Sequence, residues 1–559
     1  MVTLTRRRMI QAGTVSVGSL AVWPTAVLLT DPHLAVVGAG PGTTLESTFA
    51  RGSGRYSRMH EAAPWATVVR SDLAQGKRGR EDRRVGLATV VQVSDLHVTD
   101  VQNPMRFEYL DRYNSTGHRP QELLNVQGTA ALVGRINALT GGPATGRAVD
   151  AVMSTGDNTD NQSGNELEWL LTLLAGGTVH PESGAADDFE GVAASGLDEY
   201  WQPDSETTDR YKRLGFPHVP DLVKASTAPF EAPGLAVPWL LTMGNHDVVA
   251  NGMLENLNYV RDWSTGGRKV FSAHCDATVR LAARLDAVKA GDDVGSLIDT
   301  VARAGQTRTV QADERRLPYT GAEFVRLLHE VRFTGAGPVG HGYDLDAGSD
   351  RLFYSRRIAP RVVAISLDST NQAGGIDGSI GRTQRDWLLR ALAEAADDYV
   401  VVFSHHPSWA FDNTARDPRT PDDDRFDGGQ LAAILHDHPQ VLAWVNGHSH
   451  NNKIRPHWHR DPKRSFWEIN SASHVDAPQQ ARMIEIATNS DGTVSLFTTM
   501  IDSDAPARTS YDDLSLSSLA SMYRELAHND PARADRSGAP VDRNTELLLA
   551  DPLGRVSAV

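Results

Sequence analysis

The feature that most constrains this chain is a set of short apolar runs, each followed by a cluster of polar side chains. The runs are almost continuously apolar and rich in β-branched residues. This pattern is typical of strands buried on both faces, as in a sheet covered by helices. The runs with their polar ends are LATVVQVSDLHVTD from Leu87, AVDAVMSTGDNTDN from Ala148, VPWLLTMGNHD from Val237, RVVAISLDST from Arg361, DYVVVFSHHPSW from Asp398 and QVLAWVNGHSH from Gln440.

Helical patterns lie between these runs. Residues 383–396 (TQRDWLLRALAEAA) place Trp387, Leu388 and Leu392 on one face, and Thr383 is a candidate cap. The alternation of buried strands with helices predicts an α/β fold.

The polar clusters predict a site, because ligands in α/β sheets bind outside the carboxyl ends of the strands. Any single cluster has a simpler interpretation as a polar turn after a strand. Five clusters that each supply Asp, Asn or His make chance a poor explanation. The residues are Asp95 and His97, Asp157, Asn245 and His246, His405 and His406, and His448 and His450.

These residue types suit a pair of divalent metal ions. In Asp95-Leu-His97 both polar side chains project the same way from a strand end, since side chains repeat every second residue. Two metals about 3.5–4 Å apart can activate a water for an in-line displacement, and a carboxylate such as Asp157 can bridge them. The single cysteine, Cys275, excludes an intramolecular disulfide and a thiolate cluster, so Mn, Fe or Zn bound by His, Asp and Asn is expected.

The motifs DLH, GDNTD, GNHD, HHP and GHSH, in this order, resemble those of the calcineurin-like metallophosphoesterases. The stretch LDSTNQAGGIDGSIGRTQRDWLL is also similar to a strand, loop and helix of that family. The resemblance spans roughly residues 87–486. It implies a β-sandwich of two mixed sheets flanked by helices, with large loop insertions.

The resemblance also implies roles for individual residues. The expected metal ligands are Asp95, His97 and His450 for one ion, Asn245, His405 and His448 for the other, and Asp157 as the bridge. His405 is preferred over His406 because the family pattern is His-x-Pro. His246 is expected to protonate the leaving oxygen or stabilise charge. Asp160 is expected to orient His246, with Asp247 as the competitor.

The implied activity is hydrolysis of a phosphodiester or phosphomonoester by direct attack of a hydroxide held by two metals. Asn158 and His406 are candidate substrate-binding residues, although a surface loop is the simpler interpretation of Asn158. His474 is a further candidate to approach the site. The alternative function is a non-catalytic metal-binding or partner-binding protein that retains the fold.

Composition and charge bear on partners and location. The formal net charge of −15 gives no reason to expect nucleic acid, and a small phosphorylated substrate fits an acidic protein only if metals supply local positive charge. The basic residues 6–8 followed by a mostly apolar run to Leu29 resemble a twin-arginine export signal. We therefore expect an exported protein without a stable membrane span after signal removal, the alternative being an uncleaved anchor.

The expected organisation has four parts. Residues 1–35 are expected to contain the export signal and the start of the mature chain, residues 36–85 an N-terminal extension, and residues 86–500 the metallophosphoesterase domain. Insertions are expected at about 98–147, 163–235 and 251–355. Residues 501–559 form a helical tail, with one amphipathic helix at LSSLASMYRELAH and a second at TELLLADP.

Overall fold

The computed structural model describes residues 37–554, except 39, 114–116, 256–257, 286–293, 349–350 and 533. The expected export signal at residues 1–35 lies outside the described residues. Within the described part of the chain, no helix combines the length and apolar character needed to cross a membrane.

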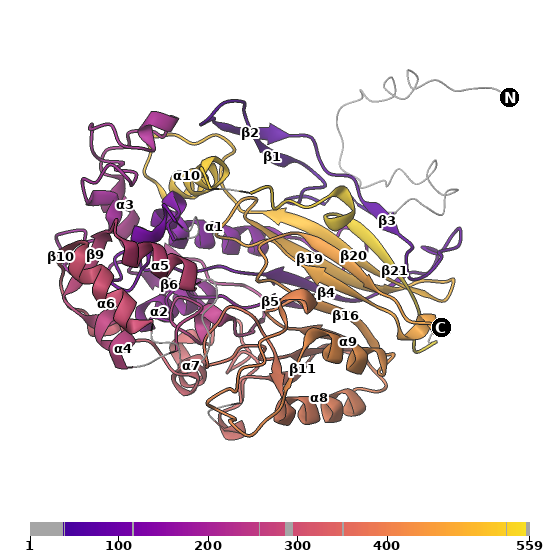
Figure 1. The fold of residues 1–559 in the computed structure, drawn as a ribbon. Coiled ribbons are helices and arrows are strands. Elements are labelled where there is room, and N and C mark those ends of the chain that lie inside the picture. The colour runs from indigo at the N-terminus through magenta and orange to yellow at the C-terminus, as the bar shows by residue number, and fades with distance from the viewer. Residues whose placement is uncertain are drawn as a thin grey trace, which may run out of the picture.

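Two large sheets dominate the structure (Figure 1). All six apolar runs of the sequence form strands of these two sheets. The seven-stranded sheet contains, in spatial order, β3 (Val68–Arg70), β21 (Thr545–Ala550), β20 (Thr493–Asp502), β19 (Gln480–Thr488), β4 (Val85–Val93), β5 (Ala151–Ser154) and β8 (Trp239–Leu241). The six-stranded sheet contains β11 (Tyr354–Ala359), β12 (Val362–Ser366), β14 (Tyr399–Phe403), β16 (Val441–Asn446), β18 (Phe466–Asn470) and β17 (Lys453–His457).

Both sheets are mixed, and their parallel parts carry the polar strand ends. Strands β4, β5 and β8 run parallel to one another, as do β12, β14, β16 and β18. The other pairs in both sheets are antiparallel, except that β3 runs parallel to β21. One hydrophobic cluster joins the sheets, with Val91 and Met153 from the first and Val401 and Val445 from the second. The expected α/β fold with two mixed sheets flanked by helices is confirmed.

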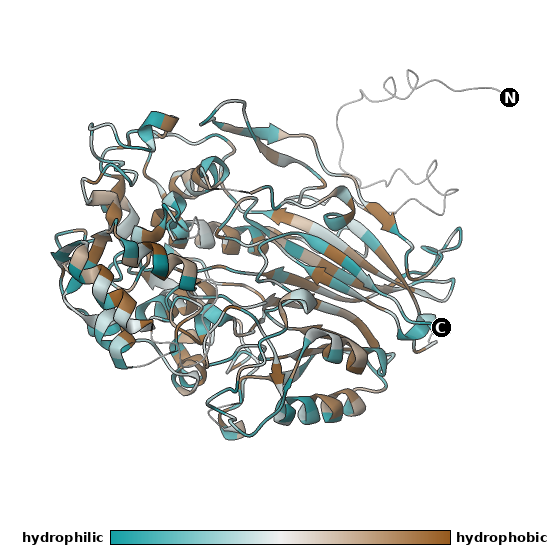
Figure 2. Cartoon of the chain, viewed as in Figure 1, coloured by the Kyte–Doolittle hydropathy of each residue, from teal (hydrophilic) through white to brown (hydrophobic). Residues whose placement is uncertain are grey.

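Helices cover the outer faces of the sheets. Helix α1 (Asn125–Ala138) contacts β20, α2 (Gly164–Ala175) and α10 (Leu516–Asn529). Helices α8 (Arg382–Glu394) and α9 (Gly428–His436) cover the second sheet (Figure 2). Leu388 and Leu431 of these helices share a hydrophobic cluster with Val400 and Val402 of the sheet. The brown, apolar residues are concentrated where helices face strands, which is the pattern expected of buried sheets.

The remaining elements lie mostly outside the two sheets. In the segment 251–355, Leu281 and Val301 share a hydrophobic cluster with Phe107 and Leu110, so two inserted segments pack on each other. The remaining helices are α3 (Leu222–Thr227), α4 (Asn258–Thr265), α5 (Asp276–Leu285), α6 (Gly295–Ala304) and α7 (Gly321–Leu328). The paired strands are β1 (Thr48–Arg51) with β2 (Met59–Ala62), β6 (Gly177–Val179) with β7 (Phe230–Ala232), β9 (Arg268–Ser272) with β10 (Gln306–Thr309), and β13 (Ile380–Gly381) with β15 (Arg425–Phe426).

The C-terminal segment contains one correction. The amphipathic helix is present as α10, but the second helix expected at TELLLADP is wrong, because Thr545–Ala550 is strand β21. Its three leucines are all buried, and the strand pairs with β20. A short apolar run of this kind does not distinguish helix from strand by its periodicity, so the neighbouring strand decides.

Candidate metal centre

The polar strand ends converge where the two sheets meet. Strands β4, β5 and β8 end before Asp95, Asp157 and Asn245, whereas β14 and β16 of the other sheet end before His405 and His448. Potential ligand atoms lie within 4.8 Å of one another in four groups of residues. These groups are Asp95, His97 and His450; His97, Asp157 and His246; Asp95, Asp157 and His405; and His405, His406 and His448.

The backbone at this site is unusual. Positive φ angles, which are uncommon for residues other than glycine, occur at several of the expected ligands. The φ values are 51° at Asp95, 45° at His97, 50° at Asp157, 65° at His448 and 53° at His450. Such conformations cost about 1–3 kcal/mol each and persist where the surrounding structure enforces them. The strain is concentrated where the sequence predicts function.

In the first half of the centre, His97 and His450 face each other. Their Nε2 atoms are 3.3 Å apart, and His450 Nε2 is 3.3 Å from Asp95 Oδ1. The outer nitrogens are occupied: His97 Nδ1 is 2.9 Å from Asp160 Oδ1, and His450 Nδ1 is 2.7 Å from Asp476 Oδ2. A proton on each Nδ1 leaves a lone pair on each Nε2, so both rings are prepared to bind one cation.

In the second half, His405 is the central residue. Its Nε2 lies 3.0 Å from Asn245 Oδ1, 3.2 Å from His448 Nδ1 and 3.2 Å from Asp157 Oδ2. Its Nδ1 donates to the Thr155 carbonyl at 2.8 Å, so Nε2 is the ring nitrogen that faces the cluster. Asp157 Oδ2 also lies 3.6 Å from His97 Nε2, so this carboxylate lies between the two halves.

The electrostatics of the second half favour a positive charge. Burial disfavours the charged imidazole of His405, yet the Asp157 and Asp95 carboxylates raise its pKa to about 9. Burial and the neighbouring His405 lower the pKa of His448 to about 3, so that ring is neutral. Buried carboxylates and imidazole lone pairs directed at one another are the donor set that Mn, Fe or Zn takes. The residues therefore fit a dinuclear metal site.

His246 lies at the edge of this cluster, with 22% of its side chain exposed. Its main-chain N–H donates to Asp157 Oδ1 at 2.9 Å, and its Nδ1 donates to the main-chain carbonyl of Asp160 at 2.7 Å. The side chain of Asp160 is farther from this ring, at 3.6 Å, because it is bonded to His97. Asp160 therefore orients His246 mainly through its backbone and His97 through its carboxylate.

Asp247, the competing candidate for orienting His246, forms hydrogen bonds with main-chain groups instead. Its carboxylate accepts main-chain N–H groups from Gly244, Asn158 and Thr159 at 2.9–3.1 Å. It therefore holds the loops after β5 and β8 together. The geometry favours Asp160 for the orienting role.

The two expected substrate-binding residues are buried and engaged elsewhere. Asn158 donates to the Thr242 carbonyl and to Asp247, and its Oδ1 accepts from the Ser154 hydroxyl. His406 Nδ1 lies 2.8 Å from Ser369 Oγ and its Nε2 lies 2.9 Å from the Ile376 carbonyl. These bonds argue against the substrate-binding expectation for both residues. They also favour His405 over His406 as the ligand.

His474 approaches the centre only through its backbone. Its N–H lies 3.1 Å from the Ser94 and Asp95 carbonyls, while its ring packs beside Tyr523. The expectation that it approaches the site therefore holds for the main chain and not for the imidazole.

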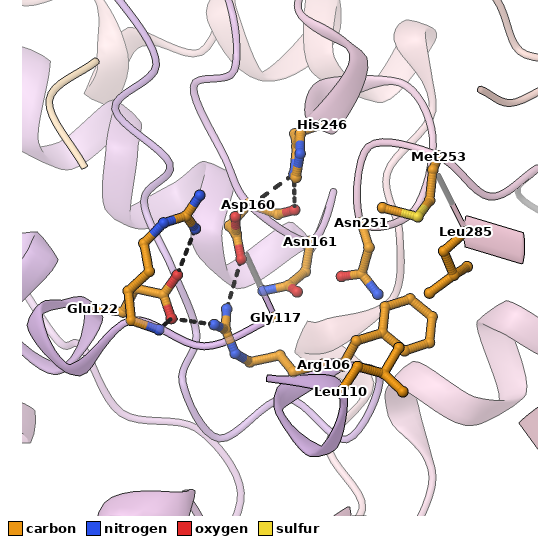
Figure 3. A pocket seen from close by; sticks show the side chains of 12 residues that line it. Arg106, Leu110, Gly117, Glu122, Asp160, Asn161, His246, Asn251, Met253 and Leu285 are labelled. Atoms are coloured by element: carbon orange, nitrogen blue, oxygen red, sulfur yellow. Dashed lines mark hydrogen bonds and ion pairs between the residues drawn. The ribbon is translucent and has the colours of Figure 1, made fainter. Parts of the chain in front are cut away.

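Sequence reasoning missed a chain of buried charges behind the first half of the centre. Asp160 Oδ2 accepts from Arg106 at 2.6 Å, and Arg106 also contacts Glu122. Figure 3 shows Arg106 joined by dashed lines to Glu122 on one side and to Asp160 on the other.

The same series of buried charges continues from Glu122 to the second histidine of this half, His450. Arg119 Nη1 lies 2.9 Å from Glu122 Oε1, and its Nε lies 2.9 Å from Asp476 Oδ1. Asp476 then binds His450. Asp476 follows β18 in SASHVDAPQQ, so its position after an apolar run was an available signal. Arg106, Arg119 and Glu122 lie in an insertion, and nothing in their local sequence marks them.

Comparisons with known proteins add similarity at the level of structure. No protein-family model matches the chain, and no curated protein matches it. The chain is similar to a dimetal phosphatase from Danio rerio, with 12% identity, 75% of this chain and 100% of that chain covered, and a TM-score of 0.34. It is also similar to GAP50, the anchor in the inner membrane complex of Plasmodium, with 9% identity, 72% and 84% covered, and a TM-score of 0.21.

Proposed function

We propose that this protein is a metal-dependent phosphoesterase that hydrolyses phosphodiesters or phosphomonoesters without a covalent enzyme intermediate. The observation that carries the proposal is the pair of facing donor sets, one around His97 and His450 and one around His405, with Asp157 between them. Two bound divalent ions would supply a hydroxide near neutral pH and charge compensation for the phosphoryl oxygens.

Different residues of the chain would bind the metals and transfer the proton. Asp95, His97 and His450 would hold one ion, Asn245, His405 and His448 the other, and Asp157 would contact both. The proton on His246 Nδ1 is fixed by the Asp160 carbonyl, so Nε2 is the atom available for proton transfer. A protonated His246 would donate from Nε2 to the leaving oxygen, which prevents accumulation of charge on it.

A small phosphorylated molecule is the proposed substrate, and a phosphodiester is favoured over a monoester. The alternative is a binding protein that retains the fold without activity. A degenerate enzyme of this kind would be expected to lack ligands or the acid. Every expected ligand position and His246 are filled here, so the enzyme is the better-supported proposal.

The test is hydrolysis of bis(p-nitrophenyl) phosphate and p-nitrophenyl phosphate by the purified full chain. The protein is chelated and then reloaded with Mn²⁺, beside the Asn245→Ala and His246→Ala variants. We expect metal-dependent turnover that both substitutions abolish or strongly reduce, and the substrate ratio separates diesterase from monoesterase. Fully loaded wild-type protein that cleaves neither compound nor a panel of natural phosphoesters would support the binding protein instead.

A further inference from the structure

A cavity of about 100 Å³ opens directly beside His246 (Figure 3). Its lining comes from two inserted segments, 98–147 and 251–355, together with the loop after β5 that carries Asp160. If His246 donates its proton to the leaving oxygen, the group attached to that oxygen must lie on the His246 side of the phosphorus. This cavity is therefore positioned to receive the leaving group.

One wall of the cavity is apolar. Phe107, Leu110, Met253 and Leu285 line it, and Figure 3 shows Met253 and Leu285 on the same side as Asn251. All four belong to or pack on one hydrophobic cluster formed between the two insertions. A compact apolar body, such as an aromatic ring, would displace water from this wall favourably.

The cavity also presents buried hydrogen-bond acceptors. Asn161 is fully buried, its Nδ2 donates to the Glu166 carboxylate, and its Oδ1 has no partner among the described residues. Asn251 Nδ2 donates to the Met105 carbonyl at 2.8 Å. The Glu166 carboxyl oxygens also accept the main-chain N–H groups of Asp100 and Asn161, and the Met105 carbonyl can only accept. The amide nitrogens of Asn161 and Asn251 are therefore the atoms that face these groups, and the two amide oxygens remain as acceptors. These two amide oxygens would form hydrogen bonds with a ligand that carries an O–H or N–H donor.

The charges around the cavity are already paired. Arg106 contacts the Asp160 and Glu122 carboxylates, and Arg119 contacts Glu122 and Asp476. Arg106 also contacts Glu108, so it has three carboxylate partners and Arg119 has two, and their positive charge is compensated before any ligand enters. A leaving group with a second phosphate would gain little electrostatic attraction in this cavity. An uncharged leaving group would lose no binding energy here through the absence of a charge.

We propose that this cavity is the leaving-group subsite, and that the substrates are phosphoesters of a compact, uncharged, partly apolar alcohol or phenol with its own hydrogen-bond donor. This proposal rests on the proposed phosphoesterase function. It assigns discrimination among phosphoesters to Asn161, Asn251 and the apolar wall.

The test compares 3-hydroxyphenyl and 3-methoxyphenyl phosphates, as monoesters or methyl diesters according to the activity found. The two leaving groups share one ring, and only the first carries a donor. We expect a kcat/KM about threefold to tenfold higher for the hydroxyphenyl ester with wild-type protein, the gain of one hydrogen bond. Binding of the product phenols, resorcinol against 3-methoxyphenol, is followed by saturation-transfer NMR as a readout independent of turnover.

Two variants make the test specific. Asn251→Gly removes one acceptor, and glycine suits the backbone there because Asn251 has φ of 49°. It should reduce the preference for the hydroxyphenyl ester, and the ratio between esters cancels their intrinsic reactivities. Met253→Trp should narrow the cavity and lower kcat/KM more for both aryl esters than for methyl phosphate. Thermal unfolding of each variant confirms that it is folded.

The outcomes separate the two proposals. Equal turnover of both esters, with ratios unchanged in Asn251→Gly and Met253→Trp, would overturn the subsite while leaving the phosphoesterase intact. Absent turnover of every phosphoester by loaded wild-type protein would overturn the phosphoesterase. In that case resorcinol binding that is lost in Asn251→Gly would still establish the cavity as a ligand site, and absent binding would overturn it too.

Discussion

His97 and His450 face each other with their Nε2 atoms 3.3 Å apart, while their outer nitrogens bind two different buried aspartates. Asp160 and Asp476 are themselves joined through a chain of two arginines and Glu122. The two imidazoles are therefore fixed from behind by one connected set of charges. Such outer partners commonly affect metal affinity about 10-fold to 100-fold when they are altered.

Glu122 is the residue that joins the two halves of this chain of charges. We predict that Glu122→Gln weakens Mn²⁺ binding at the position of Asp95, His97 and His450 by about 10-fold or more, because both arginines lose a charged partner and the aspartates shift with them. Calorimetric Mn²⁺ titration and metal content per chain measure the effect. Glu546→Gln is the matched control, since Glu546 is also buried and bound to two arginines, Arg80 and Arg84, in another part of the protein. Equal metal affinity in both variants would show that Glu122 has no positioning role.

His246 is expected to act in proton transfer and not in metal binding. We predict that His246→Gln lowers kcat by about 10²–10⁴ while the metal content per chain is retained. Asn245→Ala should instead lose one metal, because Asn245 Oδ1 faces His405 Nε2 at 3.0 Å. Elemental analysis beside steady-state kinetics distinguishes the two effects. Loss of metal in His246→Gln would place this residue among the ligands.

Gly244 allows the close approach of two loops at the centre. A Cβ atom at this position would lie 2.1 Å from the main-chain N of Asp157 and 2.2 Å from its Oδ1. We predict that Gly244→Ala displaces Asp157, abolishes binding of one metal and lowers the free energy of unfolding by about 3 kcal/mol.

The control for this change is Gly134→Ala in helix α1, where a Cβ atom would meet nothing within 4 Å. It should leave metal binding intact and raise stability by about 0.5–1 kcal/mol, because alanine is the better helix former. Denaturant unfolding and metal content check both variants. A Gly244→Ala protein that binds two metals would contradict the close-packing argument.

The buried side chain of His118, which is not one of the expected metal ligands, should make the free energy of unfolding depend on pH. Burial, followed in size by the positive charge of Arg106, lowers the pKa of His118 from 6.5 to about 3. Below pH 6.5 the unfolded chain binds a proton that the folded protein does not, so stability falls as the pH decreases from 6.5 towards 3. At pH 5 this loss is about 2 kcal/mol.

The His118→Phe variant should retain that stability at pH 5 relative to pH 7, since phenylalanine can pack against Tyr200 and Tyr211 without binding a proton. Denaturant unfolding at both pH values provides the comparison. His60→Gln changes an exposed histidine on β2 and should follow the wild type. Parallel pH dependence in His118→Phe and wild type would rule out His118 as a source of acid sensitivity.

The sequence by itself determined the buried strands and the residues at their ends. The period of a strand does not explain the Asp-x-His and His-x-His spacings, because Asp95, His97, His448 and His450 lie beyond the strand ends and have positive φ angles. Near-continuous apolar runs, however, permit little besides a covered sheet, and the polar residues follow directly after them. The centre was predictable for this reason, since the carboxyl ends of parallel strands meet at one edge. The helix at residues 383–396 was likewise readable from its apolar face, and the structure has it as α8 (Arg382–Glu394).

Only the tertiary structure decided the rest. The run TELLLADP became a strand because β20 offers it a partner, which no local periodicity records. Asn158 and His406 are hydrogen-bonded to groups distant in sequence, the Thr242 and Ile376 carbonyls among them. The Arg106–Glu122–Arg119 chain and the cavity beside His246 arise where insertions pack together. Long-range contacts of this kind depend on which surfaces meet after folding, and single residues in loops carry no periodic signal of it.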